Sequence, residues 1–139
     1  MVNGRVLAVD YGGKRTGLAC SDPLRIVASP LDPVVEPDLQ KTAAAVVAVA
    51  NDKQAKVILV GMPFLPNGNE GEQCAKVRLF ITSLRTLLAE DIQIAEIDER
   101  FSTHEAERLL RQTGLKRRQL KEHIDSTAAM VLLREYIGL

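Results

Sequence analysis

RVLAVDYGGKRTGLACSD, residues 5–22, is the segment that decides the fold of this 139-residue chain. Its first part, RVLAVD, is nearly continuous in apolar residues and ends at Asp10, which is typical of a strand buried on both faces of a sheet. Residues 12–15, GGKR, have the composition of a turn, and TGLACSD then predicts a second strand that returns antiparallel to the first. The segment therefore predicts a hairpin with an acid beside its turn.

The rest of the chain predicts a third strand and then helices that alternate with strands. The third strand is expected at RIVASPL, residues 25–31, and Pro30 and Pro33 are expected to close the three-strand meander. The later elements are expected as a helix over about 38–53, a strand KVILVGMP, a surface loop FLPNGNEGEQ, a helix over about 72–90, a strand IQIAEI, a helix from about 103 to Gly114, and a last helix over about 122–137 that starts around Asp125. This order predicts an α/β fold with a mixed five-stranded sheet, a three-strand antiparallel meander plus two parallel strands, and helices on both faces.

Length and composition limit the class of protein. A chain of 139 residues with 46% hydrophobic content can fill one core, so we expect a single domain over residues 1–139. The first residues lack the pattern of a secretory signal, and no apolar run approaches the roughly 20 residues that span a bilayer. We therefore expect a soluble, cytoplasmic protein with no membrane partner. Cys20 and Cys74 are distant in sequence and only two histidines are present, which argues against a disulfide framework or a zinc site.

Basic residues are concentrated in one part of the chain. The formal net charge is zero, which argues against a protein that coats nucleic acid by bulk electrostatics. Between Arg100 and Lys121, however, seven basic residues stand against two acidic ones, a local net charge of +5. The segment is either a solvated helix face or a surface that faces phosphate. Under the second interpretation, Arg117 and Arg118 are predicted to contact phosphate.

Three acids at the ends of predicted elements form the candidate active site. Asp10 ends the first strand, Glu99 follows the last strand, and Asp125 begins the final helix. Taken singly, each acid could instead be a turn former or a helix cap. Taken together, they are expected to meet at the carboxyl edge of the parallel strands, where they would repel one another unless a cation lay between them. We therefore predict that all three are catalytic and bind metal.

The type of ligand indicates the metal and the chemistry. Oxygen ligands without soft donors favour Mg²⁺ or Mn²⁺, and two such ions about 4 Å apart could activate water on one side of a phosphate ester and stabilise the leaving oxygen on the other. Since adjacent strand residues point to opposite faces, only one of Asp98 and Glu99 can face the site. Glu99 is the predicted ligand. Asp98 would replace it if the strand carried a bulge, and would otherwise pair with Arg100.

Residues around the acids are expected to bind the substrate. Gly12 and Gly17 flank the hairpin turn, either to let a phosphate backbone approach or simply for turn geometry. The low aromatic content of 4%, with no tryptophan, argues against base stacking and favours recognition of backbone and shape. Lys121 would share the face of Asp125 only if the last helix began early. The predicted substrate-binding residues are Gly12, Lys14, Arg15, Arg100, Thr103, Arg117, Arg118 and Lys121.

Four ordered motifs resemble the YqgF family, which is described as Holliday-junction resolvases. They are DYGGKRTGLA at 10–19, VGMP at 60–63, DERFSTHEA at 98–106, and Lys121 with DSTAA at 125–129. The resemblance runs from about residue 5 to residue 137. It implies a ribonuclease-H-like fold, catalytic acids at Asp10, Glu99 and Asp125, and a bacterial cytoplasmic nuclease that matures the 5′ end of pre-16S ribosomal RNA, with Holliday-junction resolution as the alternative.

Several alternatives stay open on the sequence alone. RNA, including pre-ribosomal particles, is favoured as the partner over branched DNA, but no identifiable group reads the 2′-hydroxyl. The sequence is compatible with either a monomer or a homodimer. The pattern DxGxxxxG after a strand also resembles the first phosphate-binding hairpin of actin-like and sugar-kinase ATPases. Those proteins use two such domains, whereas this chain supplies one copy of the motif. A non-catalytic nucleic-acid-binding module is the other alternative, and the three retained acids argue against it.

Overall fold

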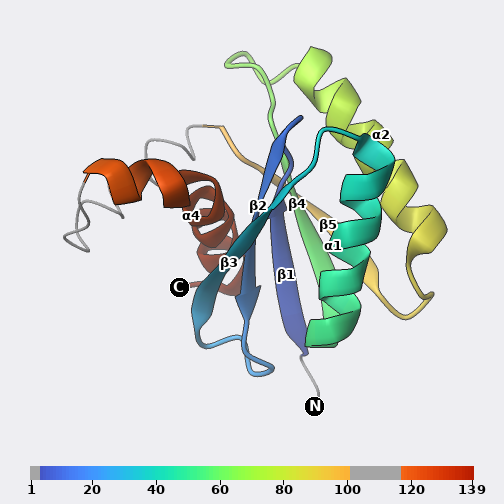
Figure 1. Ribbon diagram of the computed structural model, residues 1–139, viewed down its shortest axis with the longest axis vertical. Helices are drawn as coiled ribbons and strands as arrows, with labels where there is room; N and C mark the ends of the chain where they lie inside the picture. The colour runs from blue at the N-terminus through green and yellow to red at the C-terminus, as the bar shows by residue number, and fades with distance from the viewer. Residues whose placement is uncertain (1–3, 101–116) are drawn as a thin grey trace.

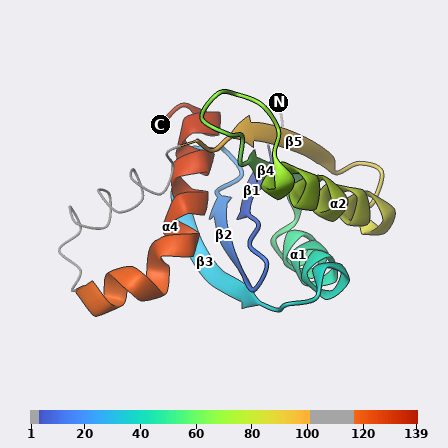
Figure 2. The ribbon, with the colours of Figure 1, turned by 90° about the horizontal axis from the view of Figure 1, so that it is seen from above.

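A mixed sheet of five strands forms the middle layer of the molecule. The computed structural model describes residues 4–100 and 117–139, with side chains over 4–100 and 126–139. The elements are β1 Arg5–Asp10, β2 Arg15–Ser21, β3 Ala28–Val35, α1 Leu39–Lys53, β4 Ala55–Met62, α2 Glu72–Leu87, β5 Gln93–Asp98 and α4 Arg117–Ile137. Helices α1 and α2 cover one face of the sheet and α4 covers the other (Figures 1 and 2). None of the helices in these described ranges is long and apolar enough to cross a membrane.

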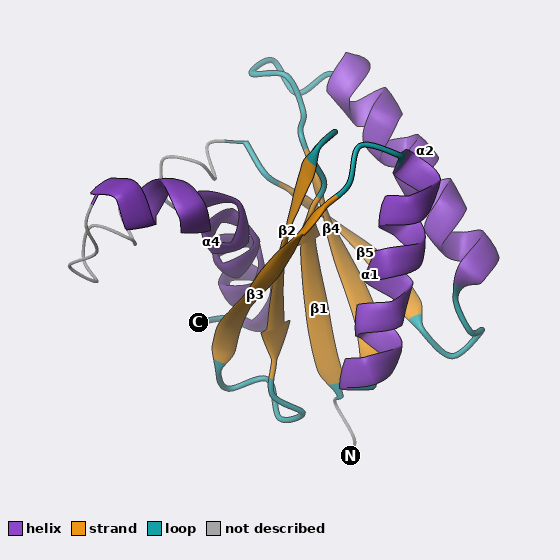
Figure 3. Cartoon of the chain, viewed as in Figure 1, coloured by secondary structure: helices purple, strands orange, loops and turns teal. Residues whose placement is uncertain are grey.

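The strands pair as predicted, with a meander followed by two parallel strands. The strand order is β3-β2-β1-β4-β5. β2 runs antiparallel to both β1 and β3, whereas β4 runs parallel to both β1 and β5. The arrows of β1, β4 and β5 therefore point to the same edge of the sheet in Figure 3. The residues that end these strands, Asp10, Met62 and Asp98, lie along that edge.

The third strand corrects a prediction, because it spans Ala28–Val35 rather than residues 25–31, so Pro30 and Pro33 both lie inside it instead of closing the meander. β3 is an outermost strand that pairs with β2 alone, and such an edge strand tolerates proline because its unpaired side needs no N–H donor. Pro30 pairs with Ala19 of β2. Farther along, the register shifts so that Gly17 faces both Asp32 and Pro33. This bulge is the second kind of position at which a sheet tolerates proline.

Helix α1 begins where the sequence predicts, whereas α4 begins earlier than predicted. α1 begins where predicted, because the Asp38 side chain accepts a hydrogen bond from the Lys41 N–H at 3.0 Å and caps the helix. α4 begins at Arg117 rather than near 122, so Asp125 lies inside the helix and not at its start. The segment RRQLKEHI before Asp125 contains no glycine or proline and is mostly of good helix propensity, which explains the earlier start. The helix predicted from about 103 to Gly114 lies outside the described residues.

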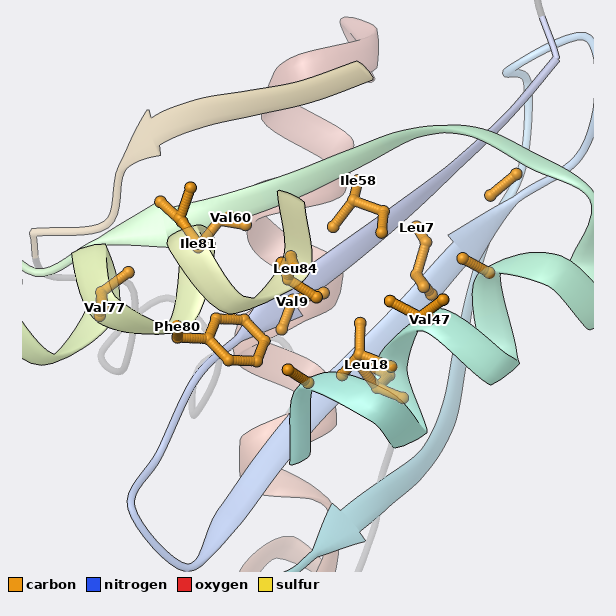
Figure 4. Close-up of a cluster of buried hydrophobic side chains, with 14 of the residues drawn as sticks. Leu7, Val9, Leu18, Val47, Ile58, Val60, Val77, Phe80, Ile81 and Leu84 are labelled. Atoms are coloured by element: carbon orange, nitrogen blue, oxygen red, sulfur yellow. The ribbon is translucent and has the colours of Figure 1, made fainter. Parts of the chain in front are cut away.

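The core is divided between the two faces of the sheet. Alternate residues of β1 contribute to both parts: Leu7 and Val9 pack with α1 and α2, whereas Val6 and Ala8 pack with α4. Figure 4 shows the first part, with aliphatic side chains of the strands facing those of the two helices. The second part contains small residues such as Ala129, which let α4 lie close to the sheet. The predicted covering of both faces is thus confirmed.

Candidate active site

Asp10 and Glu99 meet at the edge where the parallel strands end. Asp10 is the last residue of β1, and Glu99 directly follows β5. Glu99 is still hydrogen-bonded to the neighbouring strand, because its backbone N–H donates to the Met62 carbonyl oxygen of β4 at 3.1 Å. The Glu99 carboxyl is within hydrogen-bonding reach of the Asp10 carboxyl, although β4 lies between their two strands. The predicted convergence of these two acids is therefore present in the structure.

The pair has the electrostatic character of a cation site. Burial, with a contribution from the hydrogen bond and charge of Asp10 and the charge of Asp98, raises the pKa of Glu99 to about 9. Its Oε2 atom is buried, and no described polar group hydrogen-bonds to it. Buried polar atoms without a partner are uncommon in folded proteins and call for an explanation such as an ion. Two adjoining carboxyls with an unsatisfied buried oxygen are a donor set that a hard divalent cation fits.

Asp98 faces away from this pair and is held by an arginine. Arg100 contacts the Asp98 carboxylate through Nη2 at 2.6 Å and Nε at 2.8 Å, and the Arg100 backbone N–H donates to it at 2.9 Å. These hydrogen bonds hold the pKa of Asp98 below its usual range. The predicted pairing of Asp98 with Arg100 is confirmed. Glu99, and not Asp98, is the residue that approaches Asp10.

Gly61 lies beneath the Glu99 carboxyl, and its importance was not predicted from the sequence. A Cβ atom at Gly61 would lie 2.5 Å from Glu99 Oε2 and 2.7 Å from Leu132 Cδ1. The signal that could have found it is a glycine near the end of VILVGM, a buried and otherwise aliphatic strand segment. The glycine leaves the space that the carboxyl occupies.

The hairpin turn after Asp10 presents two of the predicted substrate-binding residues, Lys14 and Arg15, as exposed side chains. Gly12 is required by the turn itself, because a Cβ atom there would overlap the carbonyl oxygen of Arg15. The Gly12 N–H also donates to Thr16 Oγ1 at 3.3 Å, which closes the turn. Turn geometry is thus sufficient to explain Gly12, and its contact with substrate stays a prediction.

The third predicted acid, Asp125, lies on α4, but its side chain is outside the described part of the structure. The next residue is anchored: Ser126 Oγ donates to the carbonyl oxygen of Leu31 in β3 at 2.7 Å. Leu31 pairs with Leu18 in β2, and Leu18 adjoins Gly17, which pairs with Asp10. Ser126 is therefore bonded to the set of paired strand residues that adjoins the pair of Asp10 and Gly17.

The side chains of the other predicted site residues lie outside the described part of the structure. Thr103 lies outside the described residues, and only the helical backbone is described for Arg117, Arg118 and Lys121. Because α4 begins at Arg117, Lys121 and Asp125 are about one helical turn apart, the condition under which they were expected to share a face. Over the described part of the chain, no group of three or more His, Cys, Asp or Glu residues could hold a metal ion.

Known proteins resemble this chain over nearly its full length. Residues 4–138 match the model of a family described as RuvX: Holliday junction resolvase. An Endomicrobium trichonymphae protein named "Putative pre-16S rRNA nuclease" is 36% identical over 136 residues, which are 97% of this chain and 96% of that protein. A protein of the same name from Roseiflexus sp. (strain RS-1) is 36% identical over 134 residues, 96% and 94% of the two chains.

Two solved structures show the same fold. T. thermophilus RuvC in complex with a Holliday junction substrate aligns with a TM-score of 0.59 and 17% identity, over 97% of this chain and 96% of that one. The Fowlpox virus resolvase in complex with Holliday junction DNA aligns with a TM-score of 0.63 and 13% identity, over 99% and 97%. The ribonuclease-H-like fold predicted from the sequence is thereby confirmed.

Proposed function

The chain belongs to the RuvX family, the family that its motifs resemble, and from that membership we propose that it is a divalent-metal-dependent nuclease that hydrolyses nucleic-acid phosphodiesters. The observation that carries the proposal is the meeting of the Asp10 and Glu99 carboxyls at the carboxyl edge of the sheet, with Glu99 Oε2 buried and lacking a partner among the described groups. Ligands of open α/β sheets bind at this edge.

Asp125 is proposed as the third ligand. The hydrogen bond from Ser126 to β3 places the adjoining turn of α4 next to the sheet row of Asp10. Six residues after Ser126 in the same helix, Leu132 lies against Gly61, at the same point as the Glu99 carboxyl. The described part of α4 thus contacts the sheet close to both acids, which supports a site made from Asp10, Glu99 and Asp125.

The chain's own residues would hold and orient the reacting groups. When bound, Mg²⁺ or Mn²⁺, as one or two ions, would supply activated water and neutralise charge on the leaving oxygen. Asp10 and Glu99 would fix the ions at the sheet edge, and hydrolysis would leave a 5′-phosphate. Lys14 and Arg15 would attract the phosphate backbone from the turn after Asp10. Arg100, oriented by Asp98, would do so from the other side of Glu99.

We propose pre-16S ribosomal RNA as the substrate, processed at its 5′ end in the cytoplasm, as the family resemblance implies. The curated relatives at 36% identity are named for that RNA, whereas the structural neighbours crystallised with DNA junctions are at most 17% identical and therefore support the fold alone. Resolution of a Holliday junction is the second candidate, and the family description favours it. A junction has two-fold symmetry and would require a dimer, whereas trimming an RNA end would not.

The proposal is tested by incubating the wild type and Asp10→Asn with Mn²⁺ and either a pre-16S RNA fragment or a four-way DNA junction. We expect the wild type to cleave the RNA, and the variant to bind it but to cleave at least about a hundredfold more slowly. Asp91→Asn is the matched control, because Asp91 is exposed and pairs with Lys56 at 3.4 Å, outside the site. Cleavage that persists in excess chelator would exclude metal dependence. Equal binding without cleavage by either protein would favour a non-catalytic module.

A further inference from the structure

Gly61 occupies a position in β4 where a side chain would enter the site. β4 reads AKVILVGM, and all of its residues except Lys56 are buried. Gly61 pairs with Ile97 of β5, two residues before Glu99. The two atoms closest to a Cβ built on Gly61 are Glu99 Oε2 at 2.5 Å and Leu132 Cδ1 at 2.7 Å, both closer than real Cβ contacts. Two side chains from distant segments therefore share the space that the glycine leaves empty.

These neighbours belong to the two segments that have to meet for the site to form. Glu99 follows β5, and Leu132 is a fully buried residue of α4, the helix that also contains Asp125. Leu132 packs with Val57 and Leu59, which precede Gly61 on alternate positions of β4 and lie in the same core cluster. On the face of β4 that α4 covers, Val57 and Leu59 thus carry large side chains, whereas Gly61, the position next to the Glu99 carboxyl, carries none.

We propose that Gly61 is a positioning residue of the active site: its missing side chain lets the Glu99 carboxyl lie against β4 within reach of Asp10 while Leu132 holds α4 beside it. This inference rests on the proposed nuclease function only for its consequence in metal binding. Gly61 itself contacts neither metal nor substrate. Its effect acts through the placement of Glu99 and of the helix that carries Asp125.

The identity of the close atoms predicts which property a larger residue would change. Both are the ends of flexible side chains, so an alanine can be accommodated only if the Glu99 carboxyl rotates and Leu132 also shifts. The fold can therefore survive Gly61→Ala with the loss of stability that is typical of overpacking. The Glu99 carboxyl cannot keep its position near Asp10 at the same time. Metal affinity should fall much more than stability does.

The experiment compares the wild type, Gly61→Ala and Val57→Ala in full-length protein. Val57→Ala is the matched control, because Val57 is buried on the same face of the same strand but lies at its other end. Mn²⁺ affinity is measured by calorimetry, and unfolding is measured in urea. We expect Gly61→Ala to weaken Mn²⁺ binding at least about tenfold and Val57→Ala to leave it within about twofold, although both variants lose stability. Equal Mn²⁺ affinities of Gly61→Ala and the wild type would overturn the inference.

A second variant and a metal-free readout separate this inference from the proposed function. Glu99→Asp shortens the side chain and withdraws its carboxyl from Gly61, so adding Gly61→Ala to it should weaken Mn²⁺ binding less than about threefold further. If the wild type itself does not bind Mn²⁺, the proposed function fails, and metal-free crystal structures of the wild type and Gly61→Ala decide the inference. We expect the Glu99 carboxyl to leave the reach of Asp10 in the variant. An unmoved carboxyl would contradict the role of Gly61.

Discussion

Replacing Glu99 by glutamine should change how the stability of the metal-free protein depends on pH. The pKa of Glu99 is raised to about 9 in the folded protein, chiefly by burial, from its ordinary value of 4.5. The folded state thus holds the Glu99 proton more tightly than the unfolded state does. The associated stability is complete below pH 4.5 and is lost as the pH rises toward about 9. Glutamine has nearly the same volume and stays neutral, so the variant should not lose this stability as the pH rises.

The magnitude follows from the interval between the unfolded pKa and the pH of the assay. Each pH unit in this interval costs about 1.4 kcal/mol, so the wild type should lose about 3 kcal/mol between pH 4.5 and pH 7 through this one group. Urea unfolding of both proteins in chelator, from pH 4 to pH 8, measures the difference. We expect similar stabilities at pH 4 and a Glu99→Gln variant that is more stable by about 3 kcal/mol at pH 7.

Asp98→Asn is the control with the opposite sign. The pKa of Asp98 is lowered by its hydrogen bonds to Arg100, so its contribution is present above its usual pKa and lost as the pH falls. Removing that carboxyl should therefore not reproduce the gain in stability at pH 7. Stability profiles of the wild type and Glu99→Gln that run parallel from pH 4 to pH 8 would refute the assignment of a buried, protonated Glu99.

Two further predictions concern α4. Ser126→Ala removes the hydrogen bond to the Leu31 carbonyl oxygen, so it should cost about 1–3 kcal/mol in urea unfolding, whereas Thr82→Ala, which removes an exposed helical hydrogen bond, should cost much less. Alanine at both Arg117 and Arg118 should reduce the slope of log binding constant against log salt by about 2 if both contact phosphate, and an unchanged slope would exclude those contacts.

The sequence was sufficient for the features that local pattern determines. The apolar run before Asp10, the turn after it and the alternation of later strands with helices predicted a mixed sheet with its acids at one edge. Adjacent strand residues point to opposite faces, which predicted that Glu99 would approach Asp10 while Asp98 paired with Arg100. These inferences needed only the period of a strand and the direction of parallel strands.

The features that the sequence did not predict depend on contacts between distant segments. Pro30 and Pro33 were expected to end a strand, and only the position of β3 at the edge of the sheet, with a bulge opposite Gly17, explains their presence inside it. The start of α4 at Arg117 instead of near Asp125 is an exception, because the helix propensity of residues 117–124 accounts for it locally. Gly61 gained its significance only when Glu99 and Leu132 were found against the same point.

The proposed nuclease site requires that Asp10 and Glu99 hold a divalent cation together. A crystal structure of the wild-type protein soaked with Mn²⁺, with the ion located by its anomalous scattering, tests this most directly. We predict an ion bound by oxygens of both carboxyls at about 2 Å, with Glu99 Oε2 among its ligands or its neighbours. Saturating Mn²⁺ with no ion at either carboxyl, and with the two groups still hydrogen-bonded to each other, would contradict it.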